Sequence, residues 1–121
     1  MFVGVCRLTF HLPGNNSLKG KRRVVTRLVE RTRAKFNAAV SEVAQNDVHR
    51  SAVIGVAVVG NEGGHVDAML GRIAGFMEGL GLAPLLNKET EVIPLGGDIG
   101  GYGEQARELD EYSTFGEEEE W

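Results

Sequence analysis

The sequence has a single cysteine, Cys6, so it cannot form an internal disulfide, which is typical of proteins from reducing compartments. It also lacks any apolar run near the ~20 residues that a membrane-spanning helix needs. The N-terminus has no charged segment ahead of its apolar residues and does not resemble a signal peptide. We therefore expect a cytoplasmic protein with no membrane partner. With 121 residues, 42% of them hydrophobic, the chain is suited to one domain with a real core.

Acidic residues are nearly absent from the first third of the chain. Residues 1–36 contain nine lysines and arginines against Glu30 alone, a balance of +8. Residues 37–95 contain three basic and seven acidic residues, a balance of −4, and residues 96–121 contain one basic and nine acidic residues, a balance of −8. The three balances sum to the net charge of −4. This polarity predicts a basic docking surface and an acidic tail.

Hydrophobic periodicity predicts six elements in the order β-α-β-β-α-β. The expected strands are residues 2–12, 37–44, 52–59 and 89–95, and the expected amphipathic helices are residues 18–36 and 65–80. The third strand is almost entirely apolar, which predicts a central position covered on both faces. The second strand is weakly patterned and Pro94 lies in the last, so both are expected near edges. Two right-handed crossovers fold most simply into an α+β ferredoxin-like sandwich, with both helices on one face of a four-stranded antiparallel sheet.

We expect this domain to occupy residues 1–95 and a tail to occupy residues 96–121. Five glycines from Gly96 to Gly103, followed by a Glu-rich end, predict a flexible segment with at most a short helix over residues 104–112. Its aromatic residues are interleaved with acids. Two interpretations stay open: the tail folds back on the basic helix by charge and cation–π contacts, or it is an unstructured solubility tag.

The first helix carries the strongest functional signal. Ser17 follows the turn at Pro13–Asn16 and is a natural N-cap. An unbroken i, i+4 row of basic residues follows, made of Lys19, Arg23, Arg27, Arg31 and Lys35. Like charges at this spacing destabilise a helix by ~0.2–0.5 kcal/mol per pair. The row favours an anionic ligand, and its arginine content favours phosphate, to which the free N–H groups at the helix start would add. The predicted anion- or RNA-binding residues are Ser17, Lys19, Lys21, Arg22, Arg23, Arg27, Arg31 and Lys35.

RNA is the first choice of anion, bound through its backbone phosphates without reading of bases. The exposed face of the first strand offers Arg7, Thr9 and His11 and no aromatic side chain on which bases could stack. We therefore expect a non-catalytic RNA- or ribosome-associated accessory protein. The alternative is a homo-oligomeric interaction module, paired through the sheet face or the 89–95 edge, whose basic helix meets an acidic partner or its own tail. A solubilising basic face with no ligand is the simplest alternative.

No catalytic, cofactor or metal motif is predicted. Gly14 to Arg22 superficially suggests a P-loop, but five residues instead of four separate Gly14 from Gly20-Lys21, and Arg22 stands where Ser or Thr is required. The three histidines fall in different elements without partners at metal-ligand spacing. Cys6 is expected in the core. A small enzyme with an anion site at residues 14–21 remains a third hypothesis.

Several segments resemble the YlxP-like family of small bacterial proteins of unknown function. They are residues 3–15 (VGVCRLTFHLPGN), residues 17–23 (SLKGKRR), Phe36-Asn37 leading to residues 40–43 (VSEV), and the later GVAVVGN that precedes His65-Val66-Asp67. The resemblance covers about residues 1–95; Gly20 and the glycine-rich acidic tail depart from the pattern. It implies a ferredoxin-like fold and a gene neighbourhood of ribosome maturation and translation-initiation factors. The role of the family is not established, so it supplies no catalytic residues.

Overall fold

The computed structural model describes residues 1–96, which contain four strands and two helices. The elements are β1 (Phe2–His11), α1 (Leu18–Lys35), β2 (Ala39–Ala44), β3 (Ser51–Gly60), α2 (Gly63–Gly79) and β4 (Leu85–Pro94). The order confirms the predicted β-α-β-β-α-β arrangement. Apart from Gly96, the predicted tail and its short helix lie outside the described residues.

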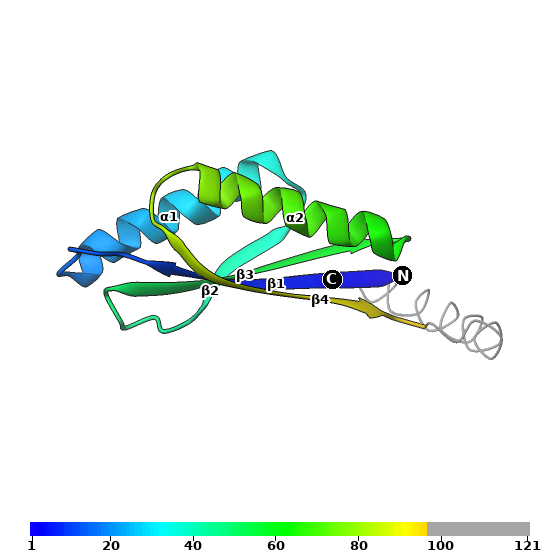
Figure 1. The fold of residues 1–121 in the computed structure, drawn as a ribbon, viewed down its shortest axis with the longest axis horizontal. Coiled ribbons are helices and arrows are strands. Elements are labelled where there is room, and N and C mark those ends of the chain that lie inside the picture. The colour runs from blue at the N-terminus through cyan, green and yellow to red at the C-terminus, as the bar shows by residue number, and fades with distance from the viewer. Residues whose placement is uncertain (97–121) are drawn as a thin grey trace, which may run out of the picture.

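All strand pairs are antiparallel, and the sheet order is β2-β3-β1-β4. Both helices lie on one face of this sheet, as Figure 1 shows, and no described element covers the opposite face. This is the expected ferredoxin-like α+β sandwich. The short β2 and the Pro94-containing β4 lie at the two edges, as predicted.

The core lies between the helices and the sheet. Alternate residues of β1, namely Cys6, Leu8 and Phe10, point into it, as do the even-numbered residues of β3 from Ala52 to Val58. Because antiparallel partners directly opposite each other share a face, the odd-numbered residues of β1 and β3 point to the open face. The helices contribute apolar side chains at a spacing of three to four residues, namely Leu28, Val29, Val66, Leu70, Ile73, Ala74 and Met77.

Two predictions about the sheet need correction. β3 is central but is covered by helices on one side only, and Val59 on its open side is 63% exposed. The apolar sequence of β3 led to the wrong prediction of two covered faces, because the residues on its open side are apolar too. β4 begins at Leu85, four residues before the predicted start. The prediction missed these first residues because apolar and polar side chains do not alternate in them, and a register shift lies opposite them at Thr9/Phe10. The helices start or end within two residues of the predicted limits.

Within residues 1–96, neither helix combines the length and the apolar character needed to cross a bilayer.

Candidate functional site

The outward side of α1 is a basic surface. We call it the α1 basic surface and define it by Lys19, Arg22, Arg23, Arg27 and Arg31, all exposed. No carboxylate of residues 1–96 lies within 4.0 Å of these five side chains, since the two ion pairs of this part of the chain lie elsewhere. The first turn of α1 contains no acidic residue. The predicted row is therefore accessible from solvent over its first four members.

The start of α1 is fixed by Ser17 and Asn15. Ser17 is the N-cap, as predicted: its Oγ accepts a hydrogen bond from the Gly20 N–H at 3.0 Å. Asn15 Nδ2 donates to the Ser17 carbonyl at 2.9 Å and also to the His49 carbonyl. Ser17 thus organises the helix start as its N-cap.

Gly20 leaves room for the Asn15 side chain in this arrangement. A Cβ atom on Gly20 would lie 2.2 Å from Asn15 Oδ1, far inside contact distance. The glycine that departs from the pattern of the YlxP-like family therefore has a local steric reason. Sequence reasoning missed it because the contact depends on how the loop at Asn15 folds back.

Lys21 does not belong to the exposed surface, which corrects its predicted placement beside the anion site. Its side chain is buried, with 1% of the residue exposed. Its Nζ lies 2.8 Å from Glu42 Oε2 and donates to the carbonyls of Gln45 at 2.5 Å, Val48 at 2.8 Å and Asn46 at 3.3 Å. These four oxygens surround the ammonium, so Lys21 joins α1 to the end of β2 and to the 45–48 turn. Its charge is neutralised inside the protein.

The C-terminal end of α1 is also engaged. Lys35 Nζ lies 5.5 Å from the centre of the Phe76 ring and 6.0 Å from that of Phe36, and these two rings meet edge to face. Arg33 Nη2 donates to the Val40 carbonyl at 2.7 Å. Although both side chains remain exposed, they are held against α2 and β2. The α1 basic surface therefore ends at Arg31.

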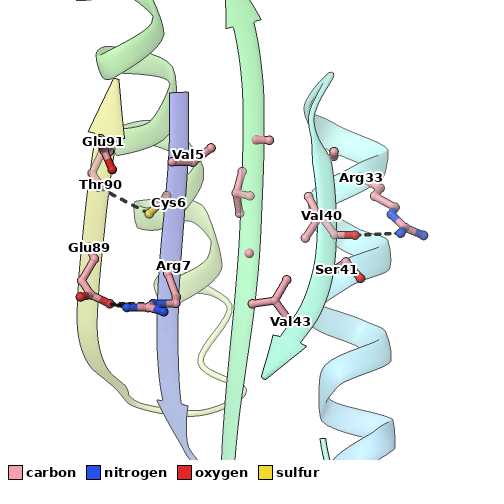
Figure 2. Close-up of a pocket in the computed structure, with 14 residues that line it drawn as sticks. Val5, Cys6, Arg7, Arg33, Val40, Ser41, Val43, Glu89, Thr90 and Glu91 are labelled. Atoms are coloured by element: carbon pink, nitrogen blue, oxygen red, sulfur yellow. Dashed lines mark hydrogen bonds and ion pairs between the residues drawn. The ribbon is translucent and has the colours of Figure 1, made fainter. Parts of the chain in front are cut away.

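The open face of the sheet is the second candidate surface, and Figure 2 shows its central part. It holds a hollow of about 730 Å³ lined mainly by apolar and small residues, among them Val5, Val43, Gly55 and Ala57. Within residues 1–96 it carries no Phe, Tyr or Trp side chain, because Phe2 and Phe10 point to the helix side, and His11 is its one ring. The described part of the sheet thus lacks the several large aromatic side chains that a platform for base stacking needs.

One ion pair crosses the open face. Arg7 of β1 donates to Glu89 of β4, and its Nε and Nη2 both lie 2.7 Å from Oε1 (Figure 2). This hydrogen bond, aided by the opposite charge, lowers the pKa of Glu89 and raises the pKa of Arg7. Both side chains are exposed, so the pair contributes little to the stability of the fold.

Other reactive groups do not come together in the described part of the chain. Cys6 is buried in the core, as predicted, and its Sγ accepts a weak hydrogen bond from Thr90 Oγ1 at 3.6 Å. Among residues 1–96, no three His, Cys, Asp or Glu side chains are grouped as metal ligands would be. The two surfaces described above are thus the candidates for function.

Comparison with known proteins places the chain in a family. Residues 3–90 match the family described as "Protein of unknown function (DUF503)", and the chain belongs to this family. It is also similar to the Uncharacterized protein YlxP of Bacillus subtilis (strain 168), with 32% identity over 62 residues. That match covers 51% of this chain and 67% of YlxP. The YlxP-like resemblance noted in the sequence is therefore confirmed.

Proposed function

We propose that this protein binds the phosphate backbone of RNA through the α1 basic surface, as a non-catalytic RNA- or ribosome-associated accessory protein of the cytoplasm. The single observation that carries the proposal is the exposed row of Lys19, Arg23, Arg27 and Arg31, joined by Arg22, without a carboxylate partner in residues 1–96.

The geometry of the row suits an extended anion. Successive members lie four residues apart, so at ~1.5 Å per residue the row from Lys19 to Arg31 spans about 18 Å along the helix. A guanidinium group can donate two parallel hydrogen bonds to a phosphate, and four of the five residues are arginines. A compact anion would engage one or two of them. A nucleic-acid strand would engage most of them.

The form of binding follows from what surrounds the row. Contacts to phosphates release counterions, so affinity falls with salt and depends little on base sequence. The absence of Phe, Tyr and Trp side chains from the described part of the open face supports binding through the backbone alone.

Acidic protein segments compete with RNA in this proposal. Residues 96–121 carry nine acids and one base, and this balance of −8 complements the α1 basic surface. Internal neutralisation by these residues would weaken RNA binding. Removal of residues 97–121 would then strengthen binding, whereas an unchanged affinity would assign the surface to an external ligand alone.

The test uses a reversal of two charges with a matched control. R23E/R27E changes the net charge by −4 on the α1 basic surface, and R72E/K88E changes it by the same amount on exposed positions of α2 and β4. We expect retention of the full chain on ribosomal RNA at low salt. We expect R23E/R27E to lower the affinity by about tenfold or more, and R72E/K88E to have a much smaller effect. Equal loss in both variants, or no binding by the unaltered chain, would refute the proposal.

A further inference from the structure

The open face of the sheet contains a continuous apolar area. Val3 of β1 is paired in register with Val59 of β3 and Ile93 of β4, and the latter two are 63% and 42% exposed. In the next row, Val5 is paired with Ala57, which is paired in turn with Ala39 of β2. These six aliphatic side chains lie on one side of the Arg7–Glu89 pair. Exposed apolar surface that crosses all four strands indicates an interaction site.

The middle of the open face contains a hollow, and one side chain projects beside it. Small residues, chiefly Gly55, Ala57 and Ser41, leave the hollow of about 730 Å³. Beside it, Val43 leans over β3 in Figure 2 and is 53% exposed. A Cβ atom on Gly55 would lie 2.7 Å from Val43 Cγ1, so the glycine leaves room for this valine. A flat partner would leave the hollow empty, whereas a surface with its own projecting side chains can fill it.

The area is enough for a dimer. Strands of ten residues are ~33 Å long, and four strands at a spacing of ~4.8 Å give a face of roughly 500–600 Å² once the shorter β2 is allowed for. Two such faces bury about 1,000–1,200 Å² in total, the lower limit for a specific interface. Facing sheets pack ~10 Å apart, with their side chains interdigitated.

The charges on this face complement one another. Among the described residues it carries Arg7, with Arg33 at its β2 edge, and two anions, Glu89 and Glu91, so the face is close to neutral. This balance does not attract a nucleic acid. In a symmetric pair, the Arg7 of each copy meets a surface that carries two carboxylates, so the same face supplies both signs.

The edges of the sheet are less suited to self-association. The Val40 carbonyl of β2 already accepts a hydrogen bond from Arg33, which lies at this edge in Figure 2. β4 carries Lys88, Glu89 and Glu91 together with Pro94, residue types that discourage strand pairing at edges.

From these observations we infer that the open face of the sheet is the contact surface of a homodimer, in which the sheets of two copies pack face to face. Each copy keeps its helices on the outside, and the two α1 basic surfaces point away from each other. The inference does not depend on RNA binding, because the open face and the α1 basic surface lie on opposite sides of the sheet.

The test measures the mass of the full chain in solution by light scattering or sedimentation equilibrium. We expect twice the monomer mass of 13.1 kDa at high micromolar concentration. V59K and I93K each place a charge in the apolar area at an already exposed position and should return the mass to 13.1 kDa. V48K is the matched control, because Val48 is 47% exposed in the 45–48 turn, off the open face. It should leave the dimer intact, and unchanged circular dichroism would show that all three variants fold.

Four results would overturn the inference. The first is a monomer up to about 1 mM, where even a weak specific dimer would be populated. The second is a dimer that V48K dissociates as well as V59K does. The third is a dimer that survives V59K and I93K but dissociates with L86K, a change at the exposed Leu86 of β4 that would assign the contact to strand pairing. The fourth is a monomer that dimerises only after removal of residues 97–121, which would make the chain's own C-terminal segment the occupant of this face.

Discussion

The inner and outer sides of α1 use the same kinds of residue for opposite purposes. On the inner side, Lys21 is buried and its ammonium is surrounded by four protein oxygens. On the outer side, Arg23, Arg27 and Arg31 are exposed and have no carboxylate partner in residues 1–96. One side therefore holds the fold together, and the other remains available to a ligand. A count of basic residues along the helix cannot distinguish the two roles.

The largest expected effect is on the inner side. Lys21→Met keeps most of the buried stem but removes the ammonium, so Glu42 and the carbonyls of the 45–48 turn lose their shared partner. Breaking a buried ion pair by removing one member destabilises proteins by about 3–5 kcal/mol. Urea denaturation should show a loss of this size. If Lys21→Met unfolds at the same urea concentration as the unaltered chain, Lys21 does not have the structural role assigned to it.

An intermediate effect is expected at the start of the helix. Gly20→Ala places a Cβ atom against Asn15 Oδ1, and the overpacking should cost about 1–3 kcal/mol, which the helix preference of alanine offsets only in part. Gly75→Ala in α2 is the matched control, since nothing lies within 4 Å of its added Cβ atom. Because alanine favours a helix over glycine, this variant should gain about 0.5–1 kcal/mol. Thermal unfolding of the two variants checks the predicted loss of stability in Gly20→Ala and the predicted gain in Gly75→Ala. A Gly20→Ala variant more stable than the unaltered chain would show that Asn15 moves aside freely.

The smallest effect, on the outer side, has the opposite sign. Arg27 forms like-charge i, i+4 pairs with Arg23 and Arg31, so Arg27→Ala removes two repulsions of about 0.2–0.5 kcal/mol each. The variant should therefore unfold at a slightly higher temperature at low salt, and the gain should shrink as salt screens the charges. A destabilised Arg27→Ala would mean that the arginine makes a structural contact and that the two sides of the helix are less distinct than described.

The sequence predicted much of this molecule because the patterns concerned are local. Alternation in β1, the 3–4 spacing in both helices and the Ser17 N-cap are visible in neighbouring residues. The burial of Lys21 depends on Glu42 and the 45–48 turn, which lie more than 20 residues away. Its helical register with Val25 and Leu28 nevertheless placed it toward the inner side, and that signal was available.

The open side of β3 was the hardest part to predict. An almost entirely apolar β3 indicates burial on both sides, and nothing in the segment itself shows that its odd-numbered side chains lack a covering helix. Only the topology, with both helices on one face, shows which side remains open (Figure 1). The hollow beside Val43 likewise depends on the pairing of β2 with β3 and on the glycine at position 55.

The most direct test of the central claim is a salt titration of RNA binding by the unaltered chain. With about five phosphate contacts from the α1 basic surface, the affinity should fall by roughly two orders of magnitude between 50 and 200 mM salt, and RNAs of different sequence should give the same slope. R23E/R27E removes two of these contacts. The plot of log affinity against log salt concentration should therefore have a shallower slope, reduced by the amount expected for about two phosphate contacts. A slope that stays the same in R23E/R27E, or an affinity that does not respond to salt, would contradict the account.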